Sequence, residues 1–280
     1  MINLVIDNHP QWFLLVPGAL NLVQGPVNYQ AFLKMGVPQE QLRLVGHWCP
    51  HQLVTNIPQD CERRIRRATS KQPPRILIPV GGAGAQRKFI LQFLTALIPL
   101  LKRTDLYVFL NAGDHVHMKK AFHDLLSNHD LEYETVSTIQ QVYTFQKDLL
   151  KSDDAKPKCA VTLFAFDDYF PAVATTDIMC RVSDILSAKP SELAFYPIPK
   201  ILIRRVGDHE ADSANRSAEL GDGTCEARTV EAAMDYVNLA LDCPKMLTQM
   251  NDSIVRNHEI GIYSGCKEAV KIAMEMNKKI

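Results

Sequence analysis

The chain has 280 residues, 46% of them hydrophobic, and its 31 Lys and Arg residues balance its 31 Asp and Glu residues. This composition supports a sizeable buried core, in one large domain or two ordinary ones. The balanced charge gives no overall field for nucleic acid or an anionic membrane, so any anion site must be local.

The first part of the chain, residues 1–70, is predicted to be the terminal part of an α/β domain followed by a linker. Its apolar runs predict the strand Ile2–Ile6, the extended pair Phe13–Val16 and Ala19–Val23, the helix Tyr29–Met35 and the strand Leu42–Val45. Asp60–Pro74 is polar and basic, which favours a helix and an interdomain linker. A nucleic-acid patch is the alternative, but no aromatic residues interleave the charges.

Residues 71–280 are predicted to form a second domain, which begins with a regular alternation of strands and helices. The strands are 75–80, 106–110, 131–136 and 160–164, and the helices between them are 88–102, 117–126 and 139–150. Such an alternation implies right-handed crossovers and an α/β fold with a doubly wound parallel sheet. Ligands bind at the carboxyl ends of such strands, where Asn111 begins one of the loops.

The second half of this domain is less regular. It is predicted to contain a short helical turn beginning near Ser191, a strand 200–206, a helix ending at Leu220, and two further helices at 230–241 and 264–276. The last helix is placed so that it could pack back on the N-terminal part. The most apolar segment, Phe89–Leu101, is short of the ~20 residues needed to cross a bilayer, so no transmembrane segment is expected.

A glycine-rich turn follows the first strand of the second domain, in the stretch R-I-L-I-P-V-G-G-A-G-A-Q-R-K from Arg75 to Lys88. Backbone N–H groups at a helix N-terminus favour an anionic group, typically phosphate. The candidate phosphate-binding residues are Gly81, Gly82, Ala83, Gly84, Ala85 and Gln86. Arg87 stands where a dinucleotide fingerprint requires Gly or Ala, which disfavours an NAD-dependent enzyme. A plain strand-to-helix turn is the alternative interpretation.

Together with three later segments, this loop resembles the C-terminal nucleotide-sugar-binding domain of GT-B glycosyltransferases. Within that class it is most similar to the peptidoglycan lipid-intermediate N-acetylglucosaminyltransferase and monogalactosyl diacylglycerol synthase group. The other matching segments are Phe164-Ala-Phe-Asp-Asp-Tyr169, Lys189-Pro-Ser-Glu192 and Asp208-His-Glu-Ala-Asp-Ser-Ala-Asn215. The resemblance implies a GT-B-like fold whose truncated N-terminal domain, at about 70 residues, is less than half of an ordinary one.

The resemblance also implies how these segments meet a UDP-sugar donor. The glycine loop faces the diphosphate, and Phe166 lies at or near the base. Lys189 and Ser191 belong to the donor-binding segment that supplies the ribose-binding Glu, for which Glu192 is the candidate. The loop is shorter than usual, so Glu192 could instead be a helix-cap carboxylate. His209, Glu210 and Asn215 reach the donor sugar and phosphates.

Glycosyl transfer expels a diphosphate, so its site needs N–H donors and cations. Lys189, Arg204, Arg205 and Arg216 are the candidate cations. A general base for the acceptor would come from the N-terminal part, where His9 is the first candidate and His47 the second, with an ordinary structural role as the alternative for each.

No metal or organic cofactor is expected, since Cys49, His51 and Cys61, or Asp114, His115 and His117, lack a second pair at zinc-site spacing. The seven cysteines at irregular spacing favour reduced thiols, and Ile2–Ile6 is too short for the h-region of a signal peptide, so a cytoplasmic location is expected.

The sequence thus predicts a UDP-sugar-dependent glycosyltransferase or a truncated form of one. The alternative is a catalytically inactive nucleotide-binding or regulatory module with the same fold. The expected partners are a nucleotide-sugar and an acceptor of undetermined chemistry, together with a second copy of the chain or a missing N-terminal half, and no nucleic acid.

Overall fold

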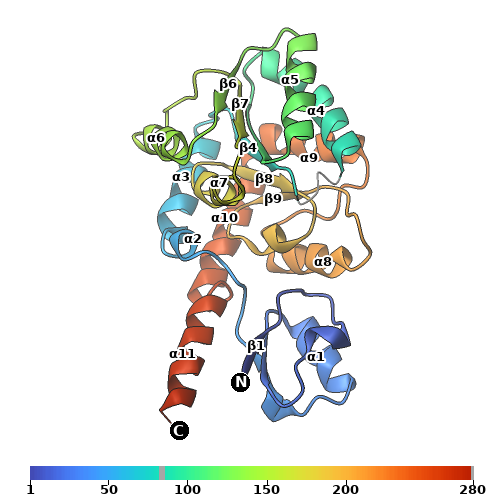
Figure 1. The fold of residues 1–280 in the computed structure, drawn as a ribbon. Coiled ribbons are helices and arrows are strands. Elements are labelled where there is room, and N and C mark those ends of the chain that lie inside the picture. The colour runs from blue at the N-terminus through green and yellow to red at the C-terminus, as the bar shows by residue number, and fades with distance from the viewer. Residues whose placement is uncertain (82–85, 279–280) are drawn as a thin grey trace.

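The computed structural model describes residues 1–81 and 86–278, and it has the predicted α/β class with parallel sheets (Figure 1). An N-terminal unit, residues 1–45, contains the strands β1 (Ile2–Leu4), β2 (Leu20–Val23) and β3 (Leu42–Leu44), which pair in that order. Helix α1 (Pro26–Lys34) covers this sheet with Phe32, which packs against Val5, Val23 and Leu42. Pro26 at the first helical position and Gly36, at φ +89°, bound the helix as their backbone preferences favour.

The extended segment predicted at Phe13–Val16 is wrong, because Trp12–Leu14 form a single 3-10 turn, η1. Local bonding explains it: the N–H of Leu15 bonds the carbonyl of Trp12, and the side-chain amide of Asn3 donates to the carbonyl of Leu14 at 2.7 Å. The apolar side chains of Trp12 and Phe13 remain exposed, so the apolar run does not mark a buried strand here.

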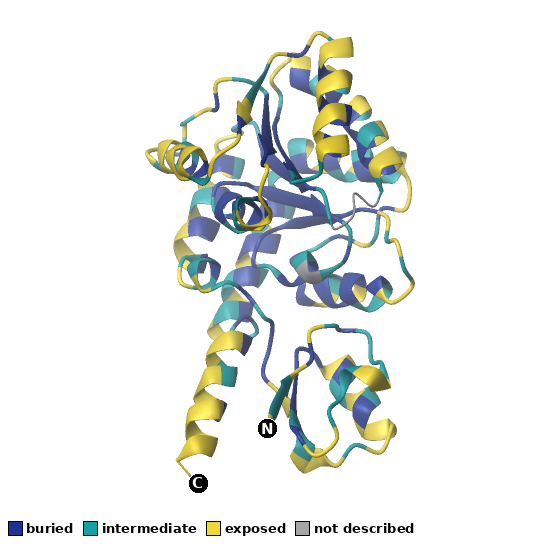
Figure 2. Ribbon diagram, in the orientation of Figure 1, coloured by how far each residue is buried: buried dark blue, intermediate teal, exposed yellow. Residues whose placement is uncertain are grey.

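The large sheet has the strand order β6-β7-β5-β4-β8-β9, and every neighbouring pair is parallel. Its strands are β4 (Arg75–Pro79), β5 (Tyr107–Gly113), β6 (Tyr133–Val136), β7 (Val161–Ala165), β8 (Ile185–Ala188) and β9 (Lys200–Leu202). Strands β4, β7, β8 and β9 are buried along their whole length (Figure 2). The strands that follow β4 in sequence, β5 to β7, lie on one side of it, and β8 and β9 lie on the other. The topological switch point is therefore between β4 and β8.

Helices cover both faces of this sheet. One face packs against α4 (Arg87–Lys102), α5 (Val116–Asn128) and α9 (Val230–Asp242). The other face packs against α6 (Ile139–Leu150) and α7 (Tyr169–Cys180). None of the helices in the described residues is long and apolar enough to cross a membrane.

Two stretches of chain join the large sheet to the N-terminal unit. The first runs from Gly46 through α2 (His51–Val54) into α3 (Ile57–Thr69), and the second connects α10 (Pro244–Glu259) to α11 (Gly265–Asn277). Helices α3 and α10 pack together through Ile57, Cys61 and Ile254. Helix α11 runs beside the N-terminal unit, where its Ile272 contacts Leu22 and Val45 (Figure 1).

The sequence-based prediction lacks the helices α2, α7 and α10 and the strand β8, and one predicted strand is too long. Helix α7 has no periodic apolar stripe, because the apolar Phe170 and Val173 are exposed while Thr175 and Thr176 are buried. The strand predicted at 200–206 ends at Leu202. Beyond it the N–H groups of Arg205 and Val206 donate to the carboxylates of Glu226 and Glu210, at 3.1 and 2.7 Å, rather than to another strand.

Candidate functional site

The carboxyl ends of β4, β8 and β9 bring three loops into contact. Gly81 ends the described part of the first loop, and the Lys189 side chain from the second lies against it, with Cε 3.2 Å from where a Cβ on Gly81 would be. The Lys189 ammonium forms an ion pair with the carboxylate of Glu210, at the start of α8 (Glu210–Leu220). Glu210 is buried and its other oxygen accepts the N–H of Val206 at 2.7 Å. A single lysine therefore joins the glycine loop, the end of β8 and helix α8.

The third loop carries two arginines, one paired with carboxylates and one exposed at the surface. Arg205 pairs with Glu226 at 3.2 Å and with Asp208 at 3.1 Å. Arg204 is exposed, and its carbonyl accepts a hydrogen bond from the side-chain amide of Gln86. Gln86 lies at the start of α4 with a left-handed φ of +69°. Its hydrogen bond to Arg204 therefore joins the first loop to the third. Arg204 keeps its guanidinium at the protein surface.

Several predicted phosphate and ribose ligands cannot be placed. Gly82, Ala83, Gly84 and Ala85 lie outside the described residues, and so does the side chain of Glu192, which begins the 3-10 helix η4 (Glu192–Phe195). Ser191 precedes this turn, is partly buried, and makes no side-chain capping bond.

A cavity of about 160 Å³ separates these loops from the N-terminal unit. Ile6, Asp7 and Leu14 line it from the N-terminal unit. Opposite them are Lys189, Pro190, Ser191, Phe195, His209, Glu210 and Ser213. Four predicted donor-contacting residues therefore border one interdomain space: Lys189, Ser191, His209 and Glu210. Asn215, further along α8, is exposed.

A second cavity, of about 340 Å³, lies at the ends of β4 and β5 beneath the start of α7. Val80, Gly113, His115, Tyr169 and Tyr196 are among its lining residues. The Tyr196 hydroxyl donates to the Asp177 carboxylate at 2.8 Å, and burial raises the pKa of Asp177. This space combines an exposed aromatic ring with polar groups at the edge where open α/β sheets bind ligands.

Two predicted site residues at this edge are occupied by contacts within the fold. The Asn111 side-chain amide donates to the carbonyl of Ala172 and the hydroxyl of Thr176, both at 2.9 Å, and its oxygen accepts the N–H of Gly113 at 3.0 Å. Phe166 is buried, and its N–H bonds the carbonyl of Gly113 at 2.9 Å. Asn111 lines the second cavity, and Phe166 is bonded to Gly113, which also lines it.

The two candidate bases have different surroundings. His9 is partly exposed, and its Nδ1 lies 2.5 Å from the Asp212 carboxylate of α8. His47 is completely buried, with Nδ1 3.2 Å from the carbonyl of Phe195 and Nε2 unpaired among the described residues. Burial, followed by the charge of Arg216, lowers the pKa of His47 to about 3. His47 is therefore neutral and enclosed, and only His9 is accessible to a substrate.

The sequence-based prediction did not identify Asp212 or Asn8 as site residues. The Asn8 amide donates to the carbonyl of Asp212 at 3.1 Å, so both residues join the N-terminal unit to α8. They are 204 positions apart, and no local pattern relates them. The signal in the sequence is their position: Asn8 lies next to His9 in a loop at a strand end, and Asp212 lies two residues after Glu210 in the first turn of α8.

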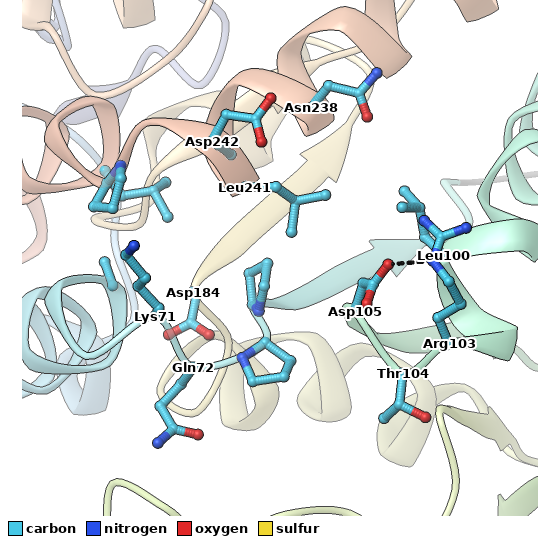
Figure 3. A pocket seen from close by; sticks show the side chains of 16 residues that line it. Lys71, Gln72, Leu100, Arg103, Thr104, Asp105, Asp184, Asn238, Leu241 and Asp242 are labelled. Carbon is cyan, nitrogen blue, oxygen red and sulfur yellow. Dashed lines mark hydrogen bonds and ion pairs between the residues drawn. The ribbon is translucent and has the colours of Figure 1, made fainter.

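Another cavity, of about 500 Å³, lies at the opposite, amino edge of the sheet (Figure 3). Three of its charged groups are engaged with protein partners: Arg103 pairs with Asp105 at 2.7 Å, and Asp184 accepts from Arg67 at 3.1 Å and from the N–H of Arg75 at 2.9 Å. Within residues 1–81 and 86–278 no group of His, Cys, Asp and Glu gathers as a metal site. The candidate functional site is therefore the carboxyl edge.

The fold is similar to that of solved proteins that hold a uridine nucleotide. UDP-GlcNAc 2-epimerase from Neisseria meningitidis, bound to UDP-GlcNAc, superimposes with a TM-score of 0.55 at 13% identity, over 91% of this chain and 61% of the epimerase. The S. aureus protein MnaA with UDP gives a TM-score of 0.56 at 10% identity, over 90% of this chain and 62% of MnaA. This chain thus spans about three fifths of the length of either structure.

At these identities the likeness establishes the fold, and no curated protein matches the sequence. A family model does match it, over residues 37–274, which is most of the chain. This range includes the large sheet, the three loops at its carboxyl edge and all of the covering helices. The chain belongs to the family described as a domain of unknown function, DUF6938.

Proposed function

We propose that this chain binds a UDP-sugar at the carboxyl edge of the large sheet and transfers the sugar to an acceptor held by the N-terminal side. The observation that carries the proposal is the convergence of Gly81, Lys189 and Glu210 beside the interdomain cavity. A lysine ammonium has three donors. After one engages Glu210, the others can meet a diphosphate at the glycine loop, where the charge of the leaving group must be stabilised.

The nucleoside is proposed to occupy the 340 Å³ cavity, with its base against the ring of Tyr169. This cavity borders Val80 and Leu193, next to the phosphate and ribose loops, so a nucleotide could extend from one to the other. The sugar would then project into the 160 Å³ interdomain cavity. That both fold relatives hold a uridine nucleotide supports the choice of UDP.

Epimerisation of the bound sugar is the second candidate function, because one relative with this fold is a UDP-GlcNAc 2-epimerase. Both reactions need the diphosphate to be held in the same way, so binding alone does not separate them. A non-catalytic nucleotide-binding module is the third. The products separate the three: free UDP indicates transfer, an isomeric UDP-sugar indicates epimerisation, and unchanged UDP-sugar indicates a module.

Calorimetric titration with UDP, UDP-glucose and UDP-GlcNAc tests binding directly. Lys189→Met is expected to raise the Kd for UDP by about 10- to 100-fold, the range for losing a charged hydrogen bond. Lys151→Met, in an exposed ion pair on α6, is the matched control and should leave the Kd unchanged. Absence of UDP binding by the unaltered chain, or equal affinities for the two variants, would refute the proposal.

A further inference from the structure

His9 and Asp212 form a pair across the interface between the N-terminal unit and α8. The two residues are 203 positions apart, and His9 Nδ1 lies 2.5 Å from Asp212 Oδ2. Neither is fully buried, since 36% of the His9 side chain and 28% of the Asp212 side chain are exposed. The pair is therefore accessible to a ligand while it joins the two parts of the molecule.

The bond determines which nitrogen of the neutral ring carries the proton. An ionised carboxylate only accepts hydrogen bonds, so Nδ1 must be the N–H that donates to Asp212. The second nitrogen, Nε2, is then left with a free lone pair that can take a proton. A carboxylate holding one side of an imidazole is the arrangement that prepares a histidine as a general base.

Further contacts fix the position of this ring. The backbone N–H of His9 donates to the Asp7 carboxylate at 3.0 Å, and the Asn8 amide donates to the carbonyl of Asp212 at 3.1 Å. Asp7 and Ser213, neighbours of the pair on either side of the interface, both line the interdomain cavity. The pair thus stands at the border of the space assigned to the sugar.

We propose that Asp212 is a positioning residue that selects the Nδ1–H tautomer of His9, so that the general base is assembled from both parts of the molecule. This inference rests on the proposed UDP-sugar transfer. The acceptor O–H proton passes to Nε2 as its oxygen forms a bond to the anomeric carbon. The bond from that carbon to the diphosphate oxygen breaks, its electron pair leaves with UDP, and the imidazolium later releases its proton to solvent.

The tautomer can be measured without any turnover. Long-range ¹H–¹⁵N spectra of the histidine side chains, recorded at about pH 8 where an ordinary imidazole is neutral, distinguish the two tautomers. The signal missing from His9→Gln identifies His9 among the nine histidines. We expect the Nδ1–H form in the unaltered chain and its loss in Asp212→Ala. An Nε2–H form in the unaltered chain, or no change in Asp212→Ala, would overturn the inference.

Kinetic measurements distinguish a role of Asp212 in positioning His9 from a role in joining the N-terminal unit to α8. UDP release is measured with the UDP-sugar that binds best, using water as the acceptor. Asp212→Ala and His9→Gln should each lower kcat by about 10²- to 10⁴-fold, with the Kd for UDP within twofold, and the double variant should lose little more because the two act as a unit. Asp148→Ala, which breaks an ion pair on α6 away from the interface, should retain the full rate.

The outcomes distinguish the two proposals. If UDP binds and Asp212→Ala keeps the full rate, the positioning role is overturned while UDP-sugar binding stands. If the unaltered chain does not bind UDP, the proposed function fails, and the tautomer spectra alone decide whether Asp212 orients His9. A fall in UDP affinity equal to the fall in rate would show a docking contact and would also overturn the positioning role.

Discussion

The ring of His47 lies 4.9 Å from the ring of Phe195, and its Nδ1 lies 3.2 Å from the Phe195 carbonyl. His47 belongs to the first stretch that joins the N-terminal unit to the large sheet, and Phe195 belongs to η4 at the sheet's carboxyl edge. Phe195 also lines the interdomain cavity. The joining segment therefore contacts a residue that borders the site.

Acid should destabilise the protein through His47. Burial lowers its folded-state pKa to about 3, against about 6.5 when unfolded, so the unfolded chain takes up the proton first. Its contribution is fully present above pH 6.5 and is lost as the pH falls toward 3, by about 1.4 kcal/mol per pH unit. Urea unfolding between pH 7 and 4 should show a decline about 3 kcal/mol steeper in the unaltered chain than in His47→Gln. Parallel declines in the two proteins would contradict this role.

Gly46 should not tolerate a side chain. It has φ +92°, and a Cβ there would stand 2.5 Å from the carbonyl oxygen of Ile262 in the second joining stretch. Gly46→Ala therefore combines backbone strain with a backbone clash and should cost more than about 3 kcal/mol in urea unfolding. Gly18→Ala is the control: its φ is +74° but its surroundings are open, so about 1 to 2 kcal/mol is expected. Equal losses of stability in the two variants would show that the backbone at Ile262 moves away from the new Cβ without cost.

The fold was predictable where hydrophobic periodicity is strong. Helix α6 has its predicted bounds, and Thr138 caps it by accepting the N–H of Gln141. Helix α7 was missed because it has no periodic apolar stripe, since the apolar Phe170 and Val173 are exposed while Thr175 and Thr176 are buried. The apolar residues Trp12 and Phe13 had the opposite effect: they favoured a buried extended segment, but both are exposed.

The candidate site was predictable only as a set of loops. The alternation of strands and helices predicts that the carboxyl ends of parallel strands share one edge, so the loop after β4 could be expected there, whereas β8 was not predicted. The structure brings Gly81, Lys189 and Glu210 together at that edge. Which groups pair across the interface depends on how the two parts dock. The pairing of His9 with Asp212 has no local signature, and neither does the enclosure of His47.

Asn111 should contribute to the stability of the protein rather than bind the ligand directly. Its amide group makes three hydrogen bonds, two of which tie the end of β5 to α7, and Asn111→Ala leaves the N–H of Gly113 and the carbonyl of Ala172 without this partner. A loss of about 2 to 4 kcal/mol in urea unfolding is expected, since each unsatisfied buried group costs about 1 to 3 kcal/mol. Asn238→Ala, at an exposed position of α9, should change stability little. An unchanged stability with weakened UDP binding would instead make Asn111 a direct ligand.

Asp222 should be among the most sensitive positions for stability. It is fully buried, pairs with Lys200 at 2.8 Å, and accepts hydrogen bonds from Ser217 at 2.8 Å and Tyr263 at 2.7 Å. These contacts join β9 and α8 to the second joining stretch, and burial lowers the pKa of Lys200 while it raises that of Tyr263.

Asp222→Ala would leave the Lys200 ammonium buried without its counter-ion and should cost about 3 to 5 kcal/mol in urea unfolding. Tyr263→Phe removes one hydroxyl and should cost about 1 to 3 kcal/mol, whereas Tyr143→Phe, at an exposed position of α6, should cost nothing measurable. In Lys200→Met/Asp222→Leu no charge remains buried, so this double variant should be more stable than Asp222→Ala alone. If it were less stable, packing rather than the buried ion pair would account for the sensitivity of this position.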